Sequence, residues 1–110
     1  MGTKKNVEVE NPIPARLKAA RKKAKITQKD LGVKIGMEES SASGRMNHYE
    51  KGRHVPDIGT LTRMAEELGV PLNYFFCKDD VTAELVCLID KLSDEEKTEL
   101  LKKLNSEKSA

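Results

Sequence analysis

The chain of 110 residues has no tryptophan, few other aromatic side chains and no long apolar run. A helix that spans a bilayer needs about 20 consecutive apolar residues, so a membrane protein is not expected. No hydrophobic region follows the lysines of the opening MGTKKNVEVE, so an export signal is not expected either. These two absences predict a cytoplasmic protein.

Cysteine is scarce, because the chain has only Cys77 and Cys87, which lie ten residues apart. There is no C-x-x-C pair and no histidine at ligand spacing, so the pattern favours reduced thiols over a disulfide or a zinc site. The chain also lacks a glycine-rich phosphate loop and a plausible set of serine, histidine and acid. We therefore expect no metal, no cofactor and no enzymatic activity.

Charge is unevenly divided along the chain, although the net charge is only +2 and the 37% of hydrophobic residues suffice for one modest core. Residues 1–55 contain 13 Lys and Arg against 6 Asp and Glu, a balance of +7. Residues 56–110 contain 7 against 12, a balance of −5. This asymmetry indicates that the N-terminal half meets a polyanion; solvated basic helix faces are the alternative explanation.

Apolar residues recur at helical spacing, and nowhere do they alternate with period two for long enough to form a strand. The pattern predicts an all-α domain of about five short helices followed by a helical tail of one or two. Pro12 and Pro14 mark the start of the first helix, and Thr27 caps a second helix that Gly36 ends. Residues 37–40 are expected to form a turn.

The first helix carries one apolar stripe, formed by Ile13, Leu17, Ala20 and Ala24. Its other faces are expected to form a basic coat: Arg16, Lys18, Arg21, Lys22, Lys23 and Lys25.

Further capping residues predict where the helices of the second half of the chain begin and end. Asp57 introduces a fourth helix that Gly69 ends, and a short apolar element, PLNYFF, begins at residue 71. Ser93 and Glu96 form a capping box for the last helix. The rings of the apolar element are expected in a core or an interface.

Residues 40–54, SSASGRMNHYEKGRH, make an unusual helix. Only Ala42, Met46 and Tyr49 share one face, at i, i+4 and i+7, and nearly everything else is small or polar. A helix with so thin an apolar stripe buries little against its own protein. Its other face therefore needs a partner.

Four motifs occur in a characteristic order: I-T-Q-K-D-L at 26–31, N-H-Y-E-K-G at 47–52, P-D at 56–57 and L-T-R-M-A-E-E-L-G-V at 61–70. Together they resemble the lambda-repressor-like helix-turn-helix transcriptional regulators of the XRE type. The resemblance covers roughly residues 12–76 and rests on the combination of motifs rather than on any one of them.

The resemblance implies a domain organisation as well as a fold. A flexible N-terminal arm is expected at 1–11, and a five-helix lambda-repressor-like DNA-binding domain at 12–77. A C-terminal helical extension at 78–110 is expected to form a dimer.

The resemblance also implies that the polar helix ending near Gly52 is a recognition helix, which lies in the major groove of DNA. Gln28 matches a position that contacts phosphate, the loop from Lys51 matches one that lies against the DNA backbone, and Glu50 matches a position tied into the domain. The expected DNA contacts are Gln28, Lys29, Ser41, Ser43, Gly44, Arg45, Asn47, His48, Lys51, Arg53 and His54. Small side chains at 43 and 44 allow close approach, and the larger polar ones reach base edges or phosphates.

One spacing departs from the family pattern. Gly36 and Tyr49 are thirteen residues apart, about one helical turn more than is usual. The extra residues either lengthen the turn or extend the recognition helix backwards. Glu38 and Glu39 fall in this segment, where a carboxylate either caps the helix or accepts a hydrogen bond from cytosine.

The expected function is therefore that of a sequence-specific regulator that binds double-stranded DNA. A repressor acting as a homodimer on a pseudo-palindromic operator is the leading prediction. The expected dimer contacts are Phe75, Phe76, Leu85, Leu88, Ile89 and Leu92. The alternative is an antitoxin-like or adaptor protein whose C-terminal helices bind a regulatory partner protein.

Overall fold

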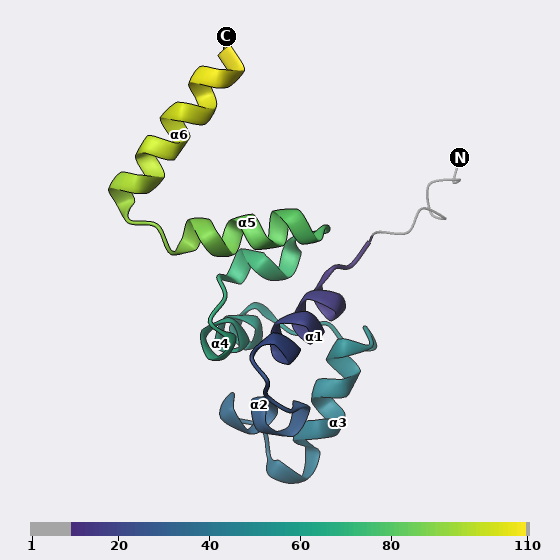
Figure 1. Cartoon of the computed structure of the whole chain (residues 1–110). Helices are drawn as coiled ribbons and strands as arrows, with labels where there is room; N and C mark the ends of the chain where they lie inside the picture. Colours follow the sequence, from purple (N-terminus) through teal and green to yellow (C-terminus); the bar gives the residue numbers. More distant parts are fainter. Residues whose placement is uncertain (1–9, 110) are drawn as a thin grey trace, which may run out of the picture.

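The computed structural model describes residues 10–109, and every regular element within that range is helical (Figure 1). The elements are α1 (Ile13–Lys23), α2 (Gln28–Lys34), α3 (Glu39–Glu50), α4 (Ile58–Leu68), the 3₁₀ helix η2 (Leu72–Phe76), α5 (Asp80–Asp90) and α6 (Asp94–Ser109). The predicted all-α fold is confirmed. Of the predicted N-terminal arm, residues 1–9 lie outside the described residues.

Local hydrogen bonds define the predicted helix ends. The side chains of Thr27 and Asp57 each accept a backbone N–H from three residues later, at 3.0 and 2.7 Å. Ser93 and Glu96 form a complete capping box: the Ser93 N–H donates to Glu96 Oε1 at 2.9 Å, and the Glu96 N–H donates to Ser93 Oγ at 3.1 Å. Gly69 ends α4 in the left-handed region, with φ of 71°. These predicted boundaries are confirmed.

The hydrophobic core lies among α1 to α4 and η2, and α5 adds Ala83 to it. Its largest fully buried side chains are Leu17, Leu31, Met46, Leu61, Met64 and Phe75. Tyr74 and Phe75 meet edge to face in η2, with ring centroids 5.7 Å apart. Phe76 is instead 48% exposed, so the apolar element divides its rings between the core and the surface.

The predicted basic coat of α1 is wrong at its two arginines. Arg16 is only 9% exposed. Its Nη2 donates to Asp80 Oδ1 at 2.5 Å and its guanidinium lies 5.9 Å from the Tyr74 ring centre. The hydrogen bond with Asp80 raises the pKa of Arg16. Arg21 is drawn inward by a carboxylate of α3. The lysines at 18, 22, 23 and 25 stay exposed as predicted, whereas Ala24 is exposed because α1 ends at residue 23.

The last helix leaves the body of the molecule. In Figure 1, α6 projects away from the bundle of α1 to α4. The radius of gyration is 17.1 Å, against roughly 13 Å for a compact domain of this length. Leu101 and Leu104 of α6 are 60% and 50% exposed. The core therefore forms without α6.

Cys77 is buried, Cys87 is half-buried, and both are free thiols, as their spacing predicted. Burial raises the pKa of the Cys87 thiol. Within the part of the chain that the structure describes, no helix has the length and apolarity needed to cross a membrane, and no group of His, Cys, Asp and Glu is arranged to hold a metal ion.

Candidate nucleic-acid interface

Helices α2 and α3 pack closely against each other through a glycine. A Cβ placed on Gly32 would lie 2.8 Å from the Ala42 Cβ, closer than real side chains approach. After α2, Gly36 adopts φ of 103°, and the Met37 N–H donates to the Gly32 carbonyl at 2.9 Å. The chain thus turns sharply and brings the start of α3 against α2.

The extra residues before Tyr49 belong to the helix. Glu38 is the N-cap residue and α3 begins at Glu39, so the predicted turn at 37–40 is wrong in its second half. The Glu38 side chain accepts no capping hydrogen bond, so capping does not explain its carboxylate. At twelve residues, α3 is about 18 Å long, and the additional turn extends its N-terminal end.

The two faces of α3 differ as the sequence predicted. Ala42 and Met46 are fully buried and Tyr49 packs against the core. The opposite face is exposed and small at Ser43 and Gly44, and a Cβ on Gly44 would meet nothing within 4 Å. The helix is therefore anchored by a thin apolar stripe and leaves an open polar face.

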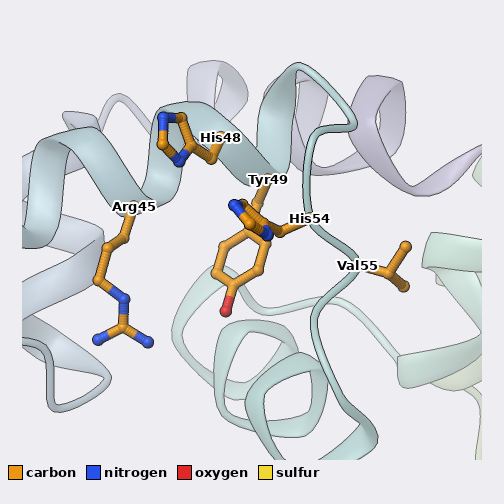
Figure 2. Close-up of a pocket in the computed structure, with 5 residues that line it drawn as sticks. All are labelled: Arg45, His48, Tyr49, His54 and Val55. Atoms are coloured by element: carbon orange, nitrogen blue, oxygen red, sulfur yellow. The ribbon is translucent and has the colours of Figure 1, made fainter.

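A shallow hollow of about 320 Å³ lies beside this face, between α3 and the loop that follows it. Figure 2 shows its lining residues, Arg45, His48 and Tyr49 from α3 and His54 and Val55 from the loop. The two imidazole rings lie 5.3 Å apart, centre to centre, at 36° to each other. The hollow thus combines a guanidinium, two imidazoles and a phenol with one apolar side chain, groups that hydrogen-bond to nucleic acid and contact its methyl groups.

A polar network fastens the inner edge of α3. Arg21 of α1 pairs with Glu50 through two hydrogen bonds, from Nε at 2.5 Å and from Nη2 at 3.1 Å. Their side chains are 12% and 3% exposed, which confirms Glu50 as a structural residue. Gln28 Nε2 donates to Glu50 Oε1 at 3.1 Å and to Asn47 Oδ1 at 3.3 Å. The amides of Gln28 and Asn47 thus help to orient α3, and the DNA contacts expected of these two residues stay predictions.

Comparisons with known proteins identify the arrangement. A family model described as a helix-turn-helix domain matches residues 15–81. The chain belongs to the XRE-type helix-turn-helix family of transcriptional regulators. In helix-turn-helix terms, α2 is the first helix of the motif and α3 the second.

Two named regulators are similar to this helix-turn-helix chain. The HTH-type transcriptional regulator ImmR of Bacillus subtilis (strain 168) is 33% identical over 67 residues, which is 61% of this chain and 50% of ImmR. The chain therefore spans about half the length of that relative. The crystal structure of transcriptional regulator BswR is 44% identical, with a TM-score of 0.77, and the match covers 86% of this chain and 93% of BswR. The likeness to BswR thus reaches beyond the helix-turn-helix domain into the C-terminal helices.

The remaining predicted contacts lie on α2, on α3 and on the loop that follows α3. Exposed positions on the helix-turn-helix motif and the following loop are Lys29, Ser41, Ser43, Gly44, Arg45, Lys51, Arg53 and His54, and His48 is half-buried. Sequence reasoning missed the structural roles of Arg21 and Gly32. For Gly32 a signal was present, because a glycine inside a helical pattern often marks a close approach of backbones. No local pattern marks Arg21, whose partner lies 29 residues away.

Proposed function

We propose that this regulator binds a specific sequence of double-stranded DNA through the outer face of α3. The observation that carries the proposal is the contrast between the two faces of that helix. Ala42 and Met46 on one face are fully buried, while Gly44 on the other has open space around it. A helix held rigidly from behind, with small and polar residues in front, fits the width of the major groove.

The exposed basic residues near α3 also support its placement against DNA. Lys51 and Arg53 are exposed on the loop that follows α3, in the half of the chain whose balance is +7. Cations at these positions neutralise phosphates and release counterions, so affinity falls steeply with salt. Phosphate contacts of this kind position a protein on the duplex without reading its sequence. Base reading is assigned to Arg45, His48 and the serines of α3.

A homodimer is the second part of the proposal, and it rests on α5. This helix buries Ala83 against the core. Its outer face nevertheless exposes Val81 by 69%, Leu85 by 50%, Leu88 by 53% and Ile89 by 38%. A helix that is apolar on both sides belongs in an interior, and a second copy supplies the missing cover with twofold symmetry.

The proposed interface differs from the dimer contacts expected from the sequence at one residue, Phe75. Phe76, 48% exposed, and the half-buried Leu92 extend the stripe of α5. Phe75 has no exposed surface and belongs to the core, so it is left out. Two recognition helices about 34 Å apart then bind a pseudo-palindromic operator. Such a dimer represses transcription, because a compact domain on a promoter excludes polymerase by occupancy alone.

A second candidate function is supported by the exposed leucines of α6. Leu101 and Leu104 are exposed on α6, the helix that projects from the body of the molecule in Figure 1, and they offer an apolar stripe to another protein. In an antitoxin-like or adaptor protein, this stripe and that of α5 bind a different partner, and DNA binding is secondary or absent. Sequence-specific, salt-sensitive DNA binding by the chain alone favours the regulator.

Fluorescence anisotropy with the DNA upstream of the protein's own gene, at several salt concentrations, tests DNA binding. We expect Arg45→Ala to weaken specific binding by roughly 5- to 100-fold, since one good base contact discriminates by about 1–3 kcal/mol. Lys97→Ala is the matched control, because Lys97 is an exposed cation on α6, far from α3 in Figure 1. Equal affinities for the wild type and Arg45→Ala, or no preference over unrelated DNA, would contradict the assignment.

Light scattering after gel filtration tests the dimer separately. We expect the wild type to have twice the chain mass and Leu88→Glu to have the monomer mass, because the carboxylate enters an apolar contact. Asp90→Arg is the control, since Asp90 is exposed on α5 outside the apolar stripe. A monomeric wild type at micromolar concentration refutes the dimer. It does not affect the test of DNA binding, which is independent.

A further inference from the structure

An ion pair joins the N-terminal ends of the two helices of the motif. Lys29 Nζ in the first turn of α2 lies 3.1 Å from Glu39 Oε2, at the first residue of α3. The two side chains are 52% and 75% exposed. Both reach solvent beside the face of α3 that the proposed function places against DNA, so the pair is available to a ligand.

The pair contributes little to folding, because exposed ion pairs gain little over their hydrated components. A carboxylate at this place also repels phosphates, which weakens general affinity for DNA. The cost is reduced by Lys29, whose ammonium neutralises Glu39 at short range. A neutralised carboxylate beside a cation presents an acceptor and a donor side by side.

The major groove contains a matching pattern. In a C·G pair, the cytosine N4 amino group is a donor and the guanine O6 is an acceptor. These two atoms are joined by a base-pair hydrogen bond, so they lie about 2.9 Å apart. Lys29 Nζ and Glu39 Oε2 are separated by a similar distance, 3.1 Å. The protein donor, Lys29 Nζ, can therefore face guanine O6 while the protein acceptor, Glu39 Oε2, faces cytosine N4.

We propose that Lys29 and Glu39 together read one C·G base pair of the operator. Glu39 accepts a hydrogen bond from cytosine N4, and Lys29 donates one to guanine O6. The inference rests on the proposed function, and it makes the additional turn of α3 a determinant of specificity. Residues at the N-terminal end of a recognition helix are the ones that contact base edges.

Selection of bound duplexes from a randomised DNA library, with the full chain, tests the pair. We expect the wild-type motif to contain one strongly preferred C·G position in each half-site. In Glu39→Gln this preference falls by roughly 5- to 100-fold and moves toward A·T, because a glutamine amide pairs with adenine N6 and N7. Glu38→Gln is the control: it removes the same charge one residue away, from a side chain with no capping hydrogen bond, and keeps the motif.

A third variant separates base reading from phosphate binding. We expect Lys29→Met to lower discrimination at the same position as Glu39→Gln. The inference is overturned if Glu39→Gln keeps the wild-type motif, if Glu38→Gln changes it equally, or if Lys29→Met weakens all sequences alike. If the wild type selects no motif at all, the proposed function itself fails. Unfolding curves of each variant confirm that the domain is folded, since all three side chains are exposed.

Discussion

Gly32 and Gly44 provide a matched test of how closely α2 approaches α3. A Cβ on Gly32 would lie 2.8 Å from the Ala42 Cβ, 3.1 Å from the Met37 Sδ and 3.2 Å from the Ala42 Cα. Carbon atoms in favourable contact lie about 3.5–4.0 Å apart, so the two helices must separate by nearly 1 Å. A Cβ on Gly44 meets nothing within 4 Å. A glycine-to-alanine substitution is therefore crowded at Gly32 and unhindered at Gly44.

Two contributions to the free energy of unfolding have opposite signs: the gain in helix propensity and the cost of overpacking. Replacing a helical glycine by alanine gains about 1 kcal/mol of helix stability at either position. At Gly32 the gain is opposed by overpacking, which costs about 1–3 kcal/mol because Ala42 Cα is backbone and has no rotamer to change. We expect Gly44→Ala to stabilise the protein, and Gly32→Ala to be less stable than Gly44→Ala by about 1–3 kcal/mol.

Urea unfolding followed by tyrosine fluorescence measures this difference. Tyr49 and Tyr74 are the only tyrosines and the chain has no tryptophan, so the signal reports the domain and not α6. A difference of 1 kcal/mol corresponds to about 4–8 °C in melting temperature. If Gly32→Ala gains as much stability as Gly44→Ala, the close approach of the helices is refuted. Gly44→Ala is further expected to weaken DNA binding, because its methyl group faces the proposed groove.

Two further predictions concern Arg21 with Glu50, and Asp57. Arg21→Met leaves the Glu50 carboxylate, 3% exposed, without its cation, so urea unfolding is expected to show a loss of about 3–5 kcal/mol. Adding Glu50→Gln should restore part of it; a double variant that is less stable still contradicts the ion-pair explanation. The N–H of Thr60 lowers the pKa of Asp57 from its usual 3.8, so its contribution to stability is present above pH 3.8 and is lost as pH falls through the lower folded value. Asp57→Asn keeps the cap without titrating, so its acid unfolding curve should be shallower; identical curves contradict this.

Local signals in the sequence were enough for the helices and for most of their ends. Thr27, Asp57 and Ser93 cap helices because a short polar side chain satisfies a free N–H three residues on. Gly69 ends a helix because glycine adopts positive φ without strain. The stripe of Ala42 and Met46 also follows from helical periodicity alone. Each of these features depends on neighbours a few residues away, which the sequence contains.

Other features depend on residues that only folding brings together. The sequence placed Arg16 and Arg21 in a basic coat. Arg16 is instead buried beside the Tyr74 ring and pairs with Asp80, 64 residues away, and Arg21 pairs with the buried Glu50, 29 residues away. No periodic pattern encodes such a partner. The same holds for Gln28, whose amide contacts Asn47 and Glu50 across two helices.

The sequence by itself determined that this chain is an all-α helix-turn-helix regulator whose second motif helix has a thin apolar stripe, because periodicity, caps and motif order are local. It left open whether the residues between Gly36 and Tyr49 lengthen the turn or the helix. The tertiary structure shows that they lengthen the helix: α3 begins at Glu39, and the close approach of Ala42 to Gly32 packs it against α2. In this arrangement Lys29 Nζ lies 3.1 Å from Glu39 Oε2.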